Sequence, residues 1–307
     1  MHPAATEIVH LLGLAESLVG VSADSDWPPD VVQRVPVLNT VAIDTRTMSS
    51  REIDAAAREG HRGASLYHVD AALLRSVRPE LILTQQACEV CAVSRRDVDQ
   101  AAQTLGDAPT ILSLNPVTLE QVLEDIETVA RVAGVPERGR ELVCERRACL
   151  EAVRAITMSL EKPRVFCMEW LDPPYSAGHW VPEMVELAGG RDDLGQPGGF
   201  SRPIEWRELV DYQPEVVVLI PCSLGLDQIA AEFPLLRQRT GWADLPATRG
   251  GRVYAANTHL FSCSGPRLAD GVEVLARLIH PEVVGQPLSK GQALKVSDDG
   301  RQLEPYS

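Results

Sequence analysis

The sequence predicts an α/β protein with two lobes, each built on a parallel sheet, and a long helical segment between them. Two short apolar phrases, PELILT at 79–84 and PEVVVLI at 214–220, have the pattern of buried strands. Segments with helical spacing follow both, and strands that alternate with helices are typical of parallel sheets covered on both faces. A chain of 307 residues suffices for two domains, since a domain takes about 100–200 residues.

The other elements follow in order along the chain. Further strands are expected at 108–114, 163–169 and 251–255. After Pro281 the sequence becomes polar, and we expect a tail with little packing. The predicted organisation is an N-terminal α/β lobe at 1–115, a helical linker at 116–161, a C-terminal α/β lobe at 162–285 and a polar tail at 286–307.

Two helices are predicted between the halves. Thr118 and Gln121 have the spacing of a capping box, and apolar residues at helical spacing follow them. After an interruption at Gly134-Val135-Pro136, a second helix is expected over 137–160. A helix of ~24 residues is ~36 Å long, which is enough to run along both lobes as a rigid strut. An ordinary amphipathic helix inside one lobe is the alternative.

The balance of acidic and basic residues indicates which type of molecule the protein binds. The 43 acidic residues outnumber the 29 basic ones, the formal net charge is −14, and the sequence has no run of clustered Lys and Arg. Nucleic acids and anionic lipids are therefore disfavoured as partners, and a small molecule is favoured. No segment approaches the ~20 apolar residues that a membrane span requires.

The start of the sequence and the cysteines bear on location. Met1-His2-Pro3 opens a segment without the basic region, apolar core or cleavage site of a secretory signal. Seven cysteines are an odd number for a disulfide framework, and reduced thiols fit a cytoplasm. A cytoplasmic location is therefore expected for the chain as given, and a periplasmic or lipid-anchored one if its start is incomplete.

Aromatic and polar side chains gather in loops that follow strands, which is where open parallel sheets bind ligands. One loop places Trp27 beside two carboxylates, and the loop at 170–180 carries Tyr175, His179 and Trp180. Core packing is the usual role of a Trp, but two prolines favour an irregular backbone in the second loop. Flat aromatic faces there would suit a large planar or macrocyclic ligand.

Several phrases share their order and spacing with one family of binding proteins. They are PAATEIV at 3–9, LVGVS at 18–22 with DWPP at 26–29, RPELIL at 78–83, DPPY at 172–175, MVELAGG at 184–190 and GPRL at 265–268. In these phrases the chain resembles the vitamin B12 and iron-siderophore binding proteins of ABC importers, most closely the cobalamin-binding branch. The resemblance runs through nearly the whole chain, to about His280.

The resemblance implies the class III substrate-binding-protein fold, in which two Rossmann-like lobes joined by one long helix clamp a ligand with little hinge motion. The family begins with a strand before Pro3, and this sequence lacks that first strand. An aromatic of the family is replaced by Gln85, and Tyr175 matches the aromatic of its Pro-Pro phrase. The residues expected to bind the ligand are Asp24, Trp27, Gln85, Gln86, Cys88, Cys91, Tyr175, His179, Trp180, Phe200, His259 and Phe261.

The resemblance also implies an ABC permease as partner, but the docking positions depart from the family. Arg95 stands where the vitamin B12 protein has a glutamate on its first lobe. Arg207, with Glu208 beside it, is the best match to the glutamate on the second lobe. Since those glutamates meet arginines on the permease, docking of this chain is expected to differ.

Several interpretations of the cysteines and histidines are possible from the sequence. Cys88 and Cys91 have no second pair for a closed zinc site and no thioredoxin-like surroundings, so buried or ligand-contacting thiols are favoured over a redox dithiol, and Cys263 could meet them. His179 and His259 are the candidates for an axial nitrogen ligand to cobalt, ahead of His68 and His2.

The sequence therefore favours a non-enzymatic protein that binds a corrinoid, such as cobalamin, as its ligand without a separate cofactor. A ferric-siderophore or haem binder is the first alternative, although anionic chelates would favour Arg or Lys at the cleft. A small thiol- or histidine-dependent enzyme, using the Cys88/Cys91 pair or His179 with a carboxylate such as Asp172, is the second. The sequence has no nucleophile elbow, P-loop or dinucleotide fingerprint.

Overall fold

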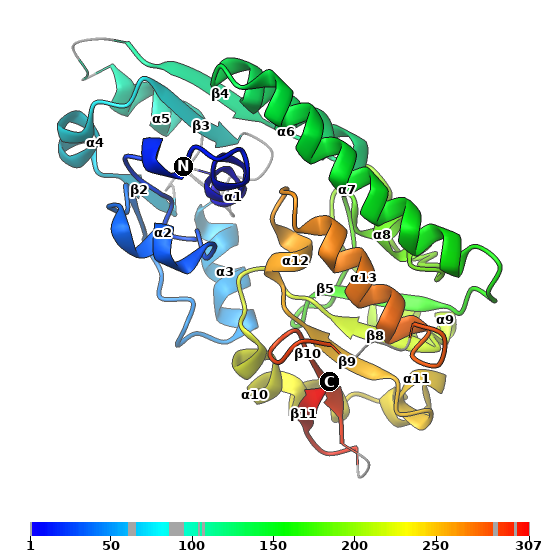
Figure 1. The fold of residues 1–307 in the computed structure, drawn as a ribbon. Helices are drawn as coiled ribbons and strands as arrows, with labels where there is room; N and C mark the ends of the chain where they lie inside the picture. The colour runs from blue at the N-terminus through cyan, green and yellow to red at the C-terminus, as the bar shows by residue number, and fades with distance from the viewer. Residues whose placement is uncertain are drawn as a thin grey trace.

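The computed structural model describes residues 2–60, 66–85, 95–103, 105, 108–284, 288–297 and 300–306. These residues form two α/β lobes, and α6 (Leu119–Val132) and α7 (Pro136–Thr157) run along one side of both (Figure 1). The two-lobed α/β architecture predicted from the sequence is confirmed. Of the residues expected at the site, Gln86, Cys88 and Cys91 lie outside the described residues.

The first lobe contains two short pairs of strands. β3 and β4 pair in parallel, and β1 and β2 pair antiparallel. The strands predicted at 79–84 and 108–114 are confirmed, with slightly different bounds. The elements of this lobe are α1 (Pro3–Leu11), η1 (Ala15–Ser17), α2 (Pro29–Arg34), β1 (Asn39–Val41), α3 (Ser50–Gly60), β2 (Tyr67–Val69), α4 (Ala71–Val77), β3 (Leu81–Gln85), α5 (Arg95–Ala102) and β4 (Thr110–Leu114).

The two helices between the lobes form much as predicted. Thr118 caps α6 by accepting a hydrogen bond from the Gln121 N–H at 3.2 Å, while the Gln121 amide oxygen accepts from Val117 N rather than from Thr118. α7 contributes Leu142 to the apolar core of the first lobe and Val153 to that of the second. Because one continuous helix enters both cores, the prediction of a strut between the lobes is confirmed.

The second lobe is built on one sheet of seven strands in the order β11-β10-β9-β8-β5-β6-β7. β5, β8 and β9 are parallel, as the sequence predicted, and the outer strands are antiparallel. Its strands are β5 (Val165–Trp170), β6 (Tyr175–Ser176), β7 (Arg202–Pro203), β8 (Val216–Leu219), β9 (Val253–Ala256), β10 (Ala293–Val296) and β11 (Leu303–Tyr306). Its helices are α8 (Val181–Leu187), α9 (Trp206–Tyr212), α10 (Leu226–Arg237), η2 (Trp242–Asp244), α11 (Pro246–Arg249), α12 (His259–Ser262) and α13 (Leu268–Ile279).

Both faces of this sheet are buried. Successive residues of a strand point to opposite faces, so neighbouring residues pack into different cores. Cys167 packs with α7, α8 and α13 on one face, whereas Phe166 and Met168 pack with α10 on the other. α7 lies against α8 and α13, which places the strut over the first of these faces (Figure 1). None of the described helices is both long enough and apolar enough to cross a membrane.

The polar tail expected after 286 is not loosely packed. β10 pairs antiparallel with β9 and with β11, and it thereby extends the main sheet by two strands. Val296 and Leu303 are buried against the core of the second lobe. The prediction of a tail with little packing is wrong, because strands of four residues with only one or two buried positions give almost no periodic signal in a polar sequence.

We predict that Leu303→Ala lowers the free energy of unfolding by about 2–3 kcal/mol, since truncating a buried Leu removes apolar contacts and leaves a cavity. Urea unfolding followed by circular dichroism measures the change. Glu304→Ala, which truncates the exposed neighbour, is the matched control and should change stability by less than about 0.5 kcal/mol. Equal effects of the two substitutions would contradict the packing of β11.

Candidate ligand-binding site between the lobes

A cavity of about 420 Å³ lies between the two lobes. On the side of the first lobe it is lined by His2, Pro3, 23–26, Thr45, Gln85, Leu114 and Pro116. On the side of the second lobe it is lined by Glu169, 179–181, Ser201, Ile220, 222–223, His259 and 261–264. The lining segments on the second lobe follow β5, β8 and β9, so the cavity lies at the carboxyl ends of the parallel strands, where such sheets bind ligands.

Six of the residues predicted for the site line this cavity: Asp24, Gln85, His179, Trp180, His259 and Phe261. The two aromatics mainly build its wall. Trp180 is only 8% exposed, and its indole N–H donates a 2.7 Å hydrogen bond to the carbonyl of Phe261, which is itself 1% exposed. The cavity therefore offers less open aromatic surface than the sequence suggested.

Trp27 and Tyr175 do not line the cavity. The Trp27 ring packs edge-on against His10 at 5.1 Å and lies under the guanidinium of Arg267. The Tyr175 hydroxyl donates a 3.2 Å hydrogen bond to Asp54 of α3. Both aromatics were expected to bind the ligand, and in this structure partners far away in the sequence engage both of them.

Phe200 also lies outside the cavity lining. Its side chain is 61% exposed, and its ring meets that of His179 edge-on at 5.2 Å. His179 in turn lies beside Trp180 with ring centroids 5.4 Å apart. Phe200 is thus a neighbour of a cavity residue rather than part of the cavity wall.

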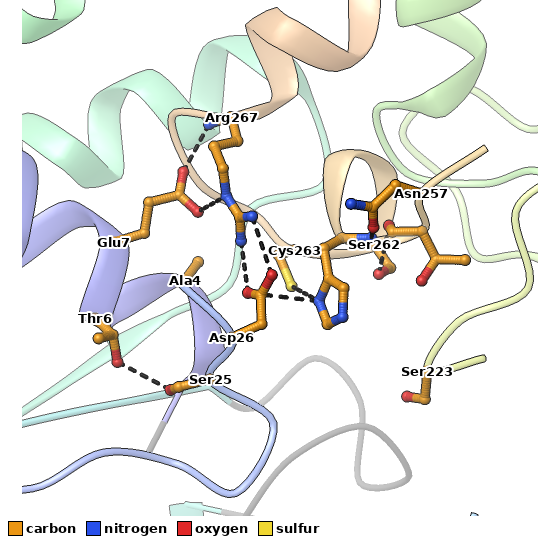
Figure 2. A network of polar contacts seen from close by, with 12 residues as sticks. Ala4, Thr6, Glu7, Ser25, Asp26, Ser223, Asn257, Ser262, Cys263 and Arg267 are labelled. Carbon is orange, nitrogen blue, oxygen red and sulfur yellow. Dashed lines mark hydrogen bonds and ion pairs between the residues drawn. The ribbon is translucent and has the colours of Figure 1, made fainter. Parts of the chain in front are cut away.

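Arg267 joins the two lobes through buried ion pairs that the sequence did not reveal. From the second lobe its Nε donates to Glu7 of α1 at 2.7 Å, and its two terminal nitrogens donate to both oxygens of Asp26 at 2.6 and 3.0 Å (Figure 2). Glu7 is 1% exposed. Asp26 lines the cavity and lies 3.6 Å from His259 Nδ1. In the sequence, the phrase GPRL at 265–268, which the family shares, was the one feature that could have drawn attention to Arg267.

Further polar contacts hold the lobes together. The buried His2 ring accepts from Ala4 N through Nδ1, and its Nε2 faces the Ser264 hydroxyl at 3.1 Å. Burial lowers the pKa of His2 to about 3, so this ring is neutral near pH 7. On α3, Ser50 N donates to Glu232 at 2.7 Å and Ser50 O accepts from the Trp170 indole. The first lobe is therefore docked on the second in more than one place.

Two carboxyl groups that line the cavity have a raised pKa. Glu169, half-buried at the end of β5, accepts hydrogen bonds from Gly178 N at 3.2 Å and from the Ser201 hydroxyl, and burial raises its pKa to about 7. Burial also raises the pKa of Asp24, against a hydrogen bond from Tyr67. His179 is affected in the opposite sense, because burial lowers its pKa. Among the described lining residues there is no Lys or Arg.

Comparison with known proteins places this architecture. The family model of periplasmic binding proteins matches residues 1–258. The chain belongs to the periplasmic binding protein family. It is 24% identical over 290 residues to the uncharacterized ABC transporter substrate-binding lipoprotein YvrC of Bacillus subtilis, covering 91% of this chain and 78% of that protein. It is 23% identical to the vitamin B12-binding protein of Vibrio cholerae, covering 88% of this chain and 84% of that protein.

A solved structure agrees in fold. The periplasmic haem-binding protein of Pseudomonas aeruginosa superposes with a TM-score of 0.69 at 22% identity, covering 99% of this chain and 95% of that one. The family and fold expected from the resemblance are thus confirmed. The relatives are named as periplasmic proteins or as a lipoprotein, which agrees with the periplasmic alternative and gives no support to a cytoplasmic location.

The second-lobe position that the sequence matched to a docking glutamate of the family carries paired charges. Arg207 is 88% exposed and lies 3.3 Å from Asp211 one turn along α9. Glu208 accepts from Arg202 and from Glu205 N, so it is committed to the start of the helix. For the first-lobe position, the Arg95 side chain lies outside what the structure describes.

We predict that Arg267→Met lowers the free energy of unfolding by about 3–5 kcal/mol, because the substitution leaves Glu7 buried without a partner. Adding Glu7→Gln should restore part of the loss, since the remaining side chain is then neutral. Urea unfolding measures all three proteins. Arg207→Met removes an exposed arginine as control and should cost less than about 0.5 kcal/mol; a comparable loss there would argue against the ion pairs as the cause.

We predict that Glu169→Gln raises the free energy of unfolding relative to the unsubstituted protein, and that this gain grows as pH rises. The folded-state pKa of about 7 exceeds the ordinary value of 4.5, so the folded protein holds a proton that the unfolded chain releases between these values. The difference in stability should be small near pH 5 and reach on the order of 1–3 kcal/mol by pH 8, at about 1.4 kcal/mol per pKa unit. Urea titrations at pH 5 to 8 measure it, with exposed Glu161→Gln as control; a pH-independent difference would refute the shift.

Proposed function

We propose that this periplasmic binding protein binds a corrinoid, such as cobalamin, between its lobes, as the substrate-binding component of an ABC importer or as a soluble corrinoid carrier. The curated relative from Vibrio cholerae that is named a vitamin B12-binding protein supports this ligand class. Binding by shape and hydrogen bonds is the activity, and the ligand itself carries the cobalt.

The observation that carries the proposal is the charge of the cavity wall. Asp24, Asp26 and Glu169 line it, and no Lys or Arg does so among the described residues. Arg267 is nearby, but two carboxylates already surround it. Haem carries two carboxylates and many ferric chelates are anionic, so both would meet like charges here, which costs several kcal/mol. The corrin periphery carries neutral carboxamides and is spared this cost.

The cavity is small for a corrinoid, which affects how such a ligand would enter. A volume of about 420 Å³ lies in the lower part of the ~300–1,000 Å³ range of small-molecule pockets. A whole cobalamin is larger than most such ligands, so we infer that the lobes separate to admit it. The Arg267 ion pairs and the Ser50 contacts with the second lobe are the interactions that separation would break.

Haem is the second candidate, because His179 and His259 line the cavity and an imidazole nitrogen can ligate iron as well as cobalt. The enzyme alternative loses its proposed dyad. Asp172, the suggested carboxylate partner of His179, instead pairs with Arg51 at 2.8 Å and with Arg239 at 3.1 Å.

We expect hydroxocobalamin and cyanocobalamin to bind the purified protein with micromolar or tighter Kd in calorimetric titrations, and haem to bind at least tenfold more weakly. Visible spectra of hydroxocobalamin should shift if a histidine replaces its axial water. The shift should disappear in His259→Ala or in His179→Ala, whichever supplies the nitrogen, and persist in the exposed control His68→Ala. Haem bound more tightly than both cobalamins, or no cobalamin bound at all, would overturn the proposal.

A further inference from the structure

Two carboxyl groups face the cavity from opposite lobes, and among the described residues that line it no Lys or Arg neutralises them. Asp24 belongs to the loop before α2 in the first lobe, and Glu169 is the penultimate residue of β5 in the second. Since the lobes close on the ligand from both sides, these two groups would contact different parts of it. The proposed function uses the negative charge of these two residues, but it does not say which groups of the ligand they contact.

Hydrogen bonds hold the loop that contains Asp24, and one carboxylate oxygen of Asp24 has no hydrogen-bond donor. Ala23 N donates to the Asn39 side chain at 3.2 Å, and the buried Ser25 hydroxyl hydrogen-bonds with that of Thr6 at 2.9 Å, which fixes the backbone on both sides of Asp24. The Asp24 Oδ2 atom is buried and has no hydrogen-bond partner. A buried carboxylate oxygen without a donor costs free energy, and a donor on a ligand would remove that cost.

Glu169 is oriented in the same manner but keeps spare capacity. Gly178 N donates to one of its oxygens and the Ser201 hydroxyl to the other. An ionised carboxylate has about four lone-pair positions, so about two remain for a ligand. Both donors come from segments that are themselves part of the wall or directly adjacent to it, so the side chain is positioned before any ligand arrives.

The remaining charges around the cavity favour the same chemistry. Asp26 adds a third carboxylate, although Arg267 engages both of its oxygens. His179 is held neutral by burial, which lowers its pKa. An anionic group of the ligand next to Asp24 or next to Glu169 would therefore meet negative charge, whereas an N–H donor there could be accepted by that carboxylate.

We propose that Asp24 and Glu169 determine specificity by accepting hydrogen bonds from N–H donors of the ligand, and that they reject the matching carboxylate. This inference rests on the proposed function and refines it: the groups recognised are carboxamide side chains of the corrin ring. Hydrolysis of one such amide to an acid replaces a donor by a negative charge. A site built for a hydrogen bond discriminates strongly against an analogue that lacks it.

The experiment compares cyanocobalamin with its monocarboxylic acids, obtained by hydrolysis of single peripheral propionamides. Calorimetric titrations at pH 8 give the Kd of each, and at this pH Glu169 is ionised because its pKa is about 7. The variants are Asp24→Asn, Glu169→Gln and the double variant. Exposed Asp30→Asn and Glu161→Gln are matched controls on the same two lobes, and circular dichroism melts check that every variant is folded.

We expect the unsubstituted protein to bind the amide at least tenfold more tightly than one or more of the acids. The double variant should reduce that ratio to below threefold, and the controls should retain it. Equal affinity for amide and every acid, or a preference that survives in the folded double variant, overturns the inference while leaving corrinoid binding intact. Failure of every corrinoid to bind the unsubstituted protein overturns the proposed function and this inference with it.

Discussion

The buried ion pairs of Arg267 are the constraint on which the site depends. Glu7 is almost inaccessible to water, and a buried carboxylate is tolerated only when a partner and hydrogen bonds compensate for lost hydration. Arg267 supplies both from the other lobe, and in doing so it fixes Asp26 beside His259 (Figure 2). Lobe separation would return these charges to water, which hydrates them again. The closed arrangement can therefore be tight without being irreversible.

The lobes are also held by packing, and the two kinds of constraint act differently. α7 enters both apolar cores, so it stays attached to both lobes whenever they are folded. Ile53 of α3 packs into the second lobe's core, but its neighbours Ser50 and Asp54 make polar contacts that water can replace. Motion that opens the cavity is thus expected at the polar contacts, with α7 as the element that remains.

Sequence alone predicted the parts of the fold that carry strong local signals. Apolar runs such as 214–220 identify a buried strand because no other environment accommodates so many adjacent Val and Leu residues. The strands at 293–296 and 303–306 were not predicted, because only two positions of the first and one position of the second are buried. Asp24 and His259 line the cavity, whereas Trp27 does not, and the packing of Trp27 against His10 and Arg267 gives no signal in the sequence.

The carboxylates of the cavity, and not the net charge of the whole chain, determine the electrostatic interactions with the ligand. The net charge of −14 suggests that anions are repelled everywhere, but salt screens surface charges beyond about 8 Å at physiological ionic strength. Discrimination must therefore arise from groups in direct reach of the ligand, where water is displaced and screening is weak. Asp24 and Glu169 meet that condition because both are partly buried at the cavity wall, and this burial raises the pKa of each carboxyl group. An aromatic wall could bind haem and corrin alike, so it is the sign of these two groups, and not the stacking surface, that separates an amide-bearing macrocycle from one bearing acids.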